Sequence, residues 1–571
     1  MQLARAGSTT SLLRCLSNWL ALGLRRPALP ALLLGGALCA CAGPGTAPAP
    51  GPAPEPVSGG GCARVQGLRL APEDIGLQTR GAAVTRAAPA AAQEPGFGRF
   101  EYCALQGEIF PVDAQAPPIR FQVNLPQRWN GKAVHMGGSG FNGTVITGTG
   151  PINMALFTSP LARGYATFGS DAGHPATAAG ADFALNDEAL LNFAWQHLKK
   201  THDVALQLIR RHYDQPPRRL YFAGASTGGR EAFTAIQRFP ADYDGIVATA
   251  PALNFAGLRL MGVRLGQASY RVPGGFLPPA KQVLVRDTAL RSCDPLDGLT
   301  DGVVAAIDAC RQRAPALLAA LRCPGGQDAG AHCLSDAQIA TVRLLHEGFS
   351  FGPYLAHGQT GYDGYNVLAG TDFSGSLGLG NSPVPAKPPS IAANGYLFAT
   401  GDAYMKYFIA RDPSYDALNF DFANPGPLRA RINALSAVVG AIDPELRPFA
   451  ARGGKVILAH GLADEVVSPN QTIGYYRSQV EQRGQAAVDA FMRFYTVPGF
   501  QHGGGTFIPF WDLLGALDRW VEQGMAPETL VATDVSAGAN GRQRPICRYP
   551  FIARYKGSGD PQRADSFNCS H

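Results

Sequence analysis

Short apolar runs alternate with longer helical stretches along much of the chain. Residues 187–213 carry apolar side chains at three- and four-residue spacing, which is typical of an amphipathic helix, and a second helix is predicted at 228–239. The runs that predict buried strands are Ile119–Leu125, Ala133–Met136, Tyr165–Ser170, Leu220–Ala223, Ile246–Ala248, Val456–Ala459 and Met492–Val497. Short strands separated by helices predict a parallel sheet that is covered on both faces.

Residues 251–446 break this alternation. They contain many glycines and prolines, four cysteines and few strand-like runs. An insertion of this size into an α/β sheet is most simply a lid domain. The sequence therefore predicts a first core segment at 62–250, the lid at 251–446 and a second core segment at 447–571.

The first 41 residues have the pattern of an export signal. Arg14, Arg25 and Arg26 precede the apolar run Ala28–Leu38, which is too short to span a bilayer as a permanent anchor. The end of the run resembles a bacterial lipoprotein box with Cys41 as the lipidated residue, and secretion without lipid is the alternative. Residues 42–61 are almost entirely Gly, Pro, Ala, Ser and Thr and are predicted to be a disordered linker. We expect an exported bacterial protein that is an outer-membrane lipoprotein, periplasmic or secreted.

Composition narrows the possible partners. Charged residues make up 16% of the 571-residue chain, against about 25% in an average soluble domain. Apolar types, at 46%, suffice for a buried core. The net charge is +6, but lysine and arginine are spread thinly, without a basic stripe that could follow a phosphate backbone. We therefore expect no nucleic-acid partner, and membrane contact only through the N-terminal lipid.

Eight cysteines remain once the predicted signal is removed. An even number in an oxidising compartment predicts four disulfides, although eight cysteines allow about 105 pairings. Proximity along the chain favours the pairs Cys62–Cys103, Cys293–Cys310, Cys323–Cys333 and Cys547–Cys569. A zinc site is disfavoured because the chain has no Cys-x-x-Cys knuckle and no Cys/His pair at zinc-finger spacing.

Gly224-Ala225-Ser226-Thr227-Gly228 matches the G-x-S-x-G pattern of a serine nucleophile on a tight turn. The pattern stands directly after a predicted strand and directly before a predicted helix, and its glycines permit a strained turn. The helix N-terminus supplies backbone N–H groups and a positive dipole end, which stabilise a developing oxyanion. The pattern alone occurs by chance in a glycine-rich chain, but its strand–turn–helix context makes Ser226 the candidate nucleophile.

A serine nucleophile requires a base and an acid that orients the base. Hydrolases with this turn take them in the chain order Ser, acid, His, from loops after later strands. Asp464 and His502 each follow one of the last two predicted strands, with a surface His and a turn Asp as the alternative interpretation. His460 is the main rival base, but it precedes the acid of its own loop and is expected to pack structurally. The backbone amides of Thr227 and Gly140 are the predicted oxyanion donors.

Several stretches together resemble the tannase and feruloyl esterase family over about residues 62–569. They are Ser226 with Gly228-Gly229-Arg230-Glu231-Ala232, Trp129-Asn130-Gly131-Lys132 before Gly137-Gly138-Ser139-Gly140, Asp171-Ala172-Gly173-His174, Arg238-Phe239-Pro240, Tyr243-Asp244-Gly245-Ile246-Val247 and the tail Ile552–Asp560. The family includes fungal tannases, feruloyl esterases and a bacterial hydrolase of mono(2-hydroxyethyl) terephthalate. The resemblance implies an α/β-hydrolase core with a large lid, which cleaves esters of aromatic acids.

The resemblance also implies a structural metal ion. Residues 293–303 resemble the calcium loop of the family's lid. In that loop the carboxylates of Asp294, Asp297 and Asp301 and the backbone carbonyls of Leu299 and Val303 would bind Ca²⁺. Hard oxygen ligands of this kind suit Ca²⁺, although the spacing is not that of an EF-hand. From the residues alone, an aspartate-rich turn is an equal alternative.

One departure from the family pattern lies beside the predicted catalytic residues. Members usually have a cysteine just before the nucleophile and another just after the histidine, bridged to each other. Here these positions are Ala225 and Gly503. We expect activity to be retained, because neither cysteine would transfer a proton.

A second departure concerns the substrate. The family's terephthalate-monoester hydrolase holds its substrate's free carboxylate with a lid arginine, but residues 344–409 contain none and offer only Lys387 and Lys406 as strong cations. The aromatic residues of that stretch, which suit a phenolic ring but equally suit a lid core, are Tyr396, Phe398, Tyr404, Tyr407 and Phe408. We expect a neutral phenolic ester to react at least as well as a terephthalate monoester anion.

The sequence therefore predicts a serine carboxylesterase for small esters of hydroxycinnamic, gallic or related aromatic acids. A hydrolase of terephthalate-type monoesters is the alternative within the enzymes. From another class, the chain could be an inactive surface-binding lipoprotein that kept the fold. The intact Ser, Asp and His argue against that last interpretation.

Overall fold

The computed structural model describes residues 57–58, 61–152, 154, 158–178 and 180–571. The predicted signal peptide with Cys41, and most of the predicted linker, lie outside the described residues. Val57–Ser58 (β1) pairs antiparallel with Arg128–Trp129 (β6). The predicted limits of the linker, 42 and 61, stay a prediction, and within them Val57 and Ser58 pair with the core.

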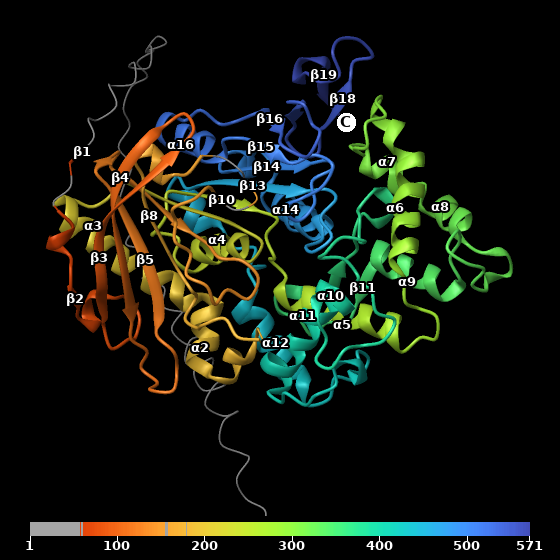
Figure 1. Ribbon diagram of the computed structural model, residues 1–571, viewed down its shortest axis with the longest axis horizontal. Coiled ribbons are helices and arrows are strands. Elements are labelled where there is room, and N and C mark those ends of the chain that lie inside the picture. The colour runs from red at the N-terminus through yellow and green to blue at the C-terminus, as the bar shows by residue number, and fades with distance from the viewer. Residues whose placement is uncertain (1–56, 59–60, 153, 155–157, 179) are drawn as a thin grey trace, which may run out of the picture. The chain divides into compact units, whose positions relative to one another are not determined.

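A ten-stranded sheet organises the described chain (Figure 1). Its strands, in spatial order, are β14 (Met492–Val497), β13 (Lys455–Gly461), β10 (Gly245–Thr249), β9 (Arg219–Ala225), β7 (Lys132–Met136), β8 (Ala166–Ser170), β5 (Ile119–Pro126), β4 (Gly98–Ile109), β3 (Ala82–Glu94) and β2 (Arg69–Leu70). The seven predicted strands all occur, with boundaries that differ by at most two residues from those expected.

The sheet is mixed rather than wholly parallel. Neighbouring strands run parallel from β14 to β8, whereas β5 is antiparallel to β8, and β4, β3 and β2 continue antiparallel. The parallel prediction is therefore wrong for Ile119–Leu125. The sequence also offered no sign of β3, because Ala82–Glu94 combines alanines with polar residues instead of an apolar run, and five of its 13 residues are exposed.

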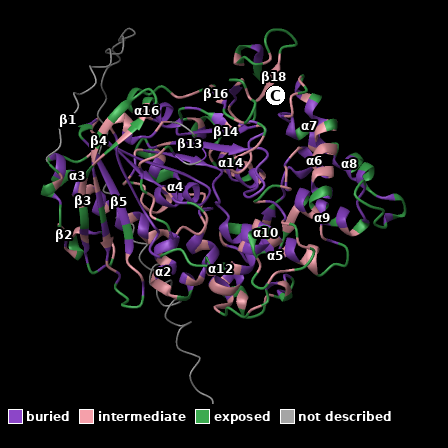
Figure 2. Cartoon of the chain, in the orientation of Figure 1, coloured by how far each residue is buried: buried purple, intermediate pink, exposed green. Residues whose placement is uncertain are grey.

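Helices cover both faces of the parallel part, as predicted. Along β10, Ile246 and Ala248 belong to one apolar cluster and Val247 to another, so alternate side chains face opposite sides. The first cluster includes residues of α3 (His197–Tyr213), α4 (Thr227–Arg238) and α14 (Pro469–Arg483), and the second includes residues of α16 (Leu513–Gln523). Figure 2 shows these central strands as buried, with the exposed residues on the outer helices and loops.

The chain between β10 and β13 contributes no strand to this sheet within its described residues. We call residues 250–454 the insert, and they form the green to teal part of Figure 1. Its helices are α5 (Phe255–Tyr270), α6 (Pro279–Cys293), α7 (Ile307–Arg311), α8 (Ala314–Leu321), α9 (Asp336–Glu347), α10 (Ile391–Asn394), α11 (Tyr396–Ala403), α12 (Leu428–Val439) and α13 (Arg447–Ala451). The predicted limits of a separate lid domain, 251 and 446, stay a prediction.

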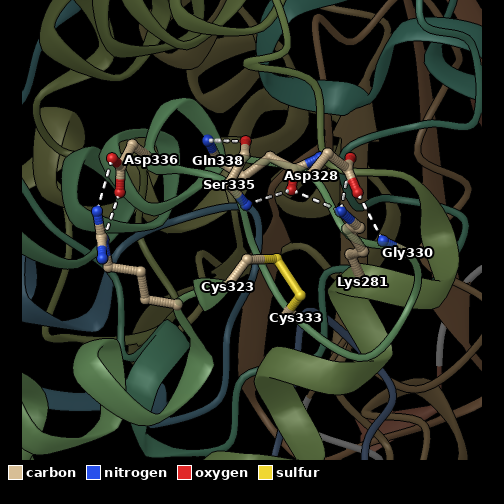
Figure 3. Close-up of a disulfide and its surroundings, with 9 residues drawn as sticks. Lys281, Cys323, Asp328, Gly330, Cys333, Ser335, Asp336 and Gln338 are labelled. Carbon is tan, nitrogen blue, oxygen red and sulfur yellow. Dashed lines mark hydrogen bonds and ion pairs between the residues drawn. A yellow bond between two sulfur atoms is a disulfide. The ribbon is translucent and has the colours of Figure 1, made fainter. Parts of the chain in front are cut away.

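The structure contains the four predicted disulfides, Cys62–Cys103, Cys293–Cys310, Cys323–Cys333 and Cys547–Cys569. Figure 3 shows Cys323–Cys333, which closes a loop of the insert beside α9. The buried ammonium of Lys281 donates to Asp328 and to Gln338, each at 2.8 Å, and so holds the loop from its other side.

The last part of the chain adds two small antiparallel sheets. They consist of β15 (Pro509–Phe510), β16 (Leu530–Asp534) and β17 (Gln543–Ile546), and of β18 (Ile552–Tyr555) with β19 (Phe567–Ser570). In the described part of the chain, no helix combines the length and apolar character that crossing a membrane requires.

Candidate active site

Ser226 stands on a sharp turn between β9 and α4. Its backbone has φ 58° and ψ −119°, a conformation that residues with a side chain rarely adopt. A Cβ atom on Gly224 would lie 2.6 Å from the backbone of Gly228, and one on Gly228 would lie 2.6 Å from the carbonyl oxygen of Gly138. Both glycines are therefore required by close backbone approach, and the turn leaves Ser226 6% exposed.

The structure brings the three predicted catalytic side chains together. Nε2 of His502 lies 3.0 Å from Oγ of Ser226, and Nδ1 of His502 lies 2.8 Å from Oδ2 of Asp464. Oδ1 of Asp464 accepts the backbone amides of Val466 and Val467, each at 2.8 Å. The fully buried acid is thus held by its own loop and orients the imidazole, an arrangement that suits proton transfer from the serine.

Mutual charge stabilisation sets the protonation of this pair. Burial by itself raises the pKa of Asp464, but the charge of His502 and hydrogen bonds from His460 and His502 bring that pKa below its usual range. Burial by itself lowers the pKa of His502, but the charge and hydrogen bond of Asp464 raise that pKa above its ordinary value. Asp464 therefore stays ionised, and His502 is a stronger base than a free imidazole.

Glu465 is a site residue that the sequence did not predict. Its Oε2 accepts the backbone amide of His502 at 3.1 Å, and the residue is 7% exposed. Burial and the neighbouring charge of Asp464 raise the pKa of Glu465 to about 7. The only sequence signal was its position next to Asp464, which does not reveal that it contacts the histidine loop.

His460 supports the acid, in agreement with its expected structural role. The residue is fully buried, and its Nδ1 lies 2.9 Å from Oγ1 of Thr472. Its Nε2 lies 3.1 Å from the carbonyl of Val467 and 3.4 Å from Oδ2 of Asp464. Asp464 thus contacts two histidines, of which His502 is the one at Ser226.

The glycine-rich loop after β7 lies against the N-terminus of α4. Oε2 of the buried Glu231 accepts the amide of Gly138 at 2.9 Å, the amide of Gly228 donates to the carbonyl of Gly138 at 2.9 Å, and the hydroxyl of Thr227 donates to the carbonyl of Gly140. The amide of Thr227 belongs to the first turn of α4, where N–H groups have no intrahelical acceptor. The two predicted oxyanion donors are therefore on adjoining segments beside Ser226, and their role stays a prediction.

An aromatic cluster follows this loop directly. The ring of Phe141 lies 5.7 Å from that of Phe255 and 5.8 Å from that of Phe408, measured between centroids. Tyr404 lies 5.1 Å from Phe408 in the same cluster. Phe398, in contrast, packs on Tyr270 at 5.3 Å, away from these rings.

The other residues named for the substrate have different surroundings. Tyr396 is half-buried with its ring 5.7 Å from the guanidinium of Arg259, and Tyr407 is also half-buried. Lys406 forms an ion pair with Asp402 at 2.6 Å, and Lys387 is exposed. Because Lys406 already has a carboxylate partner, it is a poor candidate for holding a substrate anion.

The predicted calcium residues suit a small hard cation. Asp297, Leu299, Asp301 and Val303 line one small cavity. Burial and the charges of Asp301 and Asp294 raise the pKa of Asp297 to about 6, which is the signature of crowded carboxylates. Asp294 lies beside the cavity lining, and its two oxygens accept the amides of Asp301 and Gly302 at 3.2 and 2.9 Å.

Two other features of charge bear on metal binding. Asp301 also forms an ion pair with Arg544 at 2.5 Å, so a bound cation would share this carboxylate with an arginine.

Elsewhere, His202, Asp203 and Asp242 place three potential ligand atoms within 4.8 Å of one another. The ammonium of Lys199 lies 2.9 Å from both of those aspartates and already supplies the positive charge there.

At the positions of the missing cysteine pair, backbone hydrogen bonds close the histidine loop. Ala225 is buried, and Gly503 has φ 95°. The amide of Gly503 donates to the carbonyl of Gln501 at 2.8 Å, and the amide of Gln501 donates to the carbonyl of Gly504 at 2.9 Å. Together with the Glu465 contact, these bonds fix His502 without a covalent bridge.

Comparison with known proteins gives consistent matches over most of the chain. The sequence model described as "Tannase and feruloyl esterase" matches residues 103–570. An uncharacterised esterase of Agrobacterium fabrum is 41% identical over 89% of this chain and 93% of its own length. The mono(2-hydroxyethyl) terephthalate hydrolase of Piscinibacter sakaiensis is 32% identical over 82% of this chain and 85% of its own length.

Among solved structures, feruloyl esterase B from Aspergillus oryzae matches with a TM-score of 0.71 and 24% identity, covering 86% of this chain and 97% of that one. At this identity the match shows the fold alone. The predicted α/β-hydrolase fold is confirmed.

Proposed function

The chain belongs to the tannase and feruloyl esterase family, and from this premise we propose that it hydrolyses small esters of aromatic acids through an acyl-enzyme on Ser226. That it is a carboxylic ester hydrolase follows from the family and its relatives. The serine mechanism and the aromatic acyl group are the proposal.

The observation that carries the mechanism is the line of hydrogen bonds from Ser226 through His502 to Asp464. Nε2 of His502 accepts the serine proton as Oγ attacks the acyl carbon, and the same proton then goes to the leaving alcohol. Water, deprotonated by His502, hydrolyses the acyl-enzyme and releases the acid. Asp464 stays ionised and balances the imidazolium, while the amides of Thr227 and Gly140 stabilise the oxyanion.

The aromatic acyl group is supported by the ring cluster beside the oxyanion loop. Phe141 directly follows Gly140, and Phe255 and Phe408 pack on it. An aromatic cluster at this place suits an aromatic acyl group better than an alkyl chain, because stacked and edge-to-face rings gain attraction beyond area burial. Two relatives of this chain are named for aromatic substrates, a terephthalate monoester and a feruloyl ester.

Calcium is proposed as a structural ion in the insert. Asp294, Asp297 and Asp301, with the carbonyls of Leu299 and Val303, would hold it, and its charge would remove the repulsion among the three carboxylates. The loop follows Cys293, whose disulfide with Cys310 closes the same segment. The ion takes no part in the chemistry at Ser226.

Export is supported by the four disulfides, which form and persist in oxidising compartments. Lipidation of Cys41, with anchoring in the outer membrane, remains our proposal from the sequence. Metabolic labelling with a fatty-acid probe, compared between the natural chain and Cys41→Ser, tests it. An unlabelled natural chain would mean secretion without lipid.

A fluorophosphonate probe tests the serine mechanism directly. We expect one covalent label on Ser226, detected by peptide mass spectrometry, and no label in Ser226→Ala. Hydrolysis of methyl ferulate, methyl gallate and mono(2-hydroxyethyl) terephthalate by the same preparation identifies the acyl group. Absence of both labelling and turnover would instead favour an inactive binding protein that has kept the fold.

A further inference from the structure

A buried arginine of the insert lacks the partners that its charge requires. Arg259, on α5, is 1% exposed. Its Nη1 donates to the hydroxyl of Thr400 at 2.8 Å, but its Nε is buried without a hydrogen-bond partner. Among the described residues no carboxylate forms an ion pair with it, and Glu55 is the only acidic residue outside them. A guanidinium has five N–H donors and is costly to bury unpaired.

Arg230 shows what a structural buried arginine looks like in the same molecule. It is fully buried and its Nε likewise has no partner, but its two terminal nitrogens donate to the carbonyls of Ala194, Val439 and Phe193 at 2.9, 2.8 and 3.2 Å. Glu231 lies 3.9 Å away as its counter-charge. Arg259 has neither the carbonyls nor the carboxylate, so its place in the fold is not explained by such contacts.

The position of Arg259 connects it to the active site. Its guanidinium lies 4.9 Å from the ring centroid of Phe141, the residue after the oxyanion-loop Gly140. It also lies 4.6 Å from the ring centroid of Phe255, the first residue of α5. Three residues before Phe255, the amide of Ala252 donates to the carbonyl of Ser226 at 3.1 Å. The charge of Arg259 also lowers the pKa of His502.

A second polar group without a partner belongs to the same cluster. The hydroxyl of Tyr404 is buried without a hydrogen-bond partner, and its ring lies 5.9 Å from that of Phe255. The aromatic faces of Phe141, Phe255 and Tyr396 stabilise the cation without neutralising it. What this cluster lacks is an anion.

We propose that Arg259 recognises a carboxylate that the substrate carries away from the ester bond, within the aromatic cluster next to Gly140. The substrate class is therefore an aromatic ester with a second, free carboxylate, on either the acid or the alcohol part. This inference rests on the proposed esterase function. It replaces the expectation from residues 344–409, because the cation comes from α5, which lies outside that stretch.

The test uses matched pairs of esters that differ in charge. Monomethyl terephthalate and methyl 4-methylbenzoate differ by a carboxylate on the acid part, and caffeoyl quinate and methyl caffeate differ by one on the alcohol part. We expect the natural enzyme to prefer the anion in one pair. At a pH well above the pKa of His502, Arg259→Gln should lower kcat/KM for that anion by about tenfold to a hundredfold, mainly through KM, and change the neutral ester by less than about threefold.

Arg264 supplies the matched control variant. It lies on the same helix and also stacks on a phenyl ring, Phe349 at 5.0 Å, but it does not contact Phe141. Arg264→Gln should leave the ratio between charged and neutral esters unchanged. Arg259→Lys retains the charge without the planar fork and should keep part of the preference.

Binding gives a measurement that does not depend on turnover. In the Ser226→Ala background, calorimetric titration with the preferred anion should show a Kd that Arg259→Gln raises by about tenfold or more. Equal losses for charged and neutral esters in Arg259→Gln, or no charge preference in either pair, would overturn the proposal. Absence of fluorophosphonate labelling and of all turnover would overturn the serine mechanism, while the titration still decides whether Arg259 binds the anion.

Discussion

Ser226 has a backbone conformation that only its flanking glycines and its place above the sheet make possible. At this scale the first prediction concerns the catalytic residues. Ser226→Ala and His502→Ala should each lower kcat by about 10⁴-fold or more, and the double variant should be little worse, because the residues act as a unit. Steady-state rates measure the loss of activity, and a circular dichroism spectrum shows whether each variant is still folded. Additive losses would contradict a shared mechanism.

The second prediction concerns pH. The ionised form of Glu465 raises the pKa of His502. Only neutral His502 can accept the serine proton, so the acid limb of the kcat/KM profile follows that pKa. Glu465→Gln removes the negative charge, lowers the pKa of His502 and should shift the acid limb to lower pH, while the amide oxygen still accepts the His502 N–H.

Glu445 serves as the control for this profile. It is an acid on the surface, paired with Arg447 at 2.5 Å. Glu445→Gln should leave the acid limb in place. A limb that moves to higher pH in Glu465→Gln, or that does not move, would show that the charge of Glu465 does not reach the histidine.

At the residue scale the sequence reveals only what a motif or chain order encodes. The order of Ser226, Asp464 and His502 after successive strands was enough to identify three side chains that the fold brings into hydrogen-bonding distance. Glu465 and Arg259 belong to no motif. What distinguishes them is burial, and for Arg259 the lack of a carboxylate partner among the described residues, which are properties of the folded chain that one sequence does not contain.

At the scale of elements, the nucleophile turn and the glycine-rich loop depend on each other. A Cβ on Gly228 would meet the carbonyl oxygen of Gly138 at 2.6 Å, and backbone atoms cannot move aside as a flexible side chain can. Gly228→Ala should therefore displace the oxyanion loop and lower kcat by about a hundredfold, the usual loss for one oxyanion donor. Gly504→Ala, where a Cβ meets nothing within 4 Å, is the matched control. Equal rates in the two variants would show that the loop tolerates the shift.

The calcium loop gives a prediction about stability. Removal of the ion with EDTA, or Asp294→Ala, should lower the melting temperature by about 5 °C, because binding to the folded state alone adds about 2.7 kcal/mol at a hundredfold excess over Kd. Elemental analysis should find one calcium per chain. Asp421, which accepts the amides of Ala423 and Asn424 in an exposed turn, is the control. If EDTA lowers the melting temperature of Asp421→Ala as it does that of the natural chain, but no longer lowers that of Asp294→Ala, the calcium binds at the Asp294 loop. If EDTA changes the melting temperature of none of them, the loop is an aspartate-rich turn without a metal ion.

The strands that the sequence identified are those whose burial on both faces requires apolar runs. β10 and β13, each flanked by parallel neighbours, are buried along almost their whole length. β3 lies at the antiparallel end, where alternate residues face solvent, and its alanines carry too little hydrophobic signal to stand out. The antiparallel direction of β5 had no signal either, because strand direction depends on the partner that the fold supplies.

At the scale of the whole molecule, two arginines of α4, one buried and one half-buried, join the core to the insert. Arg230 donates to Val439 at the end of α12 and to two carbonyls of η5 (Asn192–Gln196). Arg238, at the end of α4, donates to Ala437 at 3.2 Å and to Val438 at 3.4 Å. The helix that begins just after the nucleophile therefore also anchors α12 of the insert.

Arg230→Met should show how much this connection contributes. The variant keeps an apolar side chain of similar length but leaves three buried carbonyls without donors, each of which costs about 1–3 kcal/mol. We expect the free energy of unfolding in urea to fall by about 3 kcal/mol or more. Arg271→Met breaks a half-exposed ion pair with Asp416 and should cost less than about 1 kcal/mol.

The number of steps in the urea unfolding curve tests whether the insert and the core unfold together. If Arg230 is what couples the insert to the core, its loss should split the transition into two steps, with tryptophan fluorescence of the core changing at higher urea than ester hydrolysis. The insert supplies Phe255 and Phe408 to the cluster beside Gly140, so activity should be lost with the insert and not with the sheet. A single, shifted transition that abolishes both signals together would show that the insert and the core unfold as one unit, with Arg230 as one contact among many.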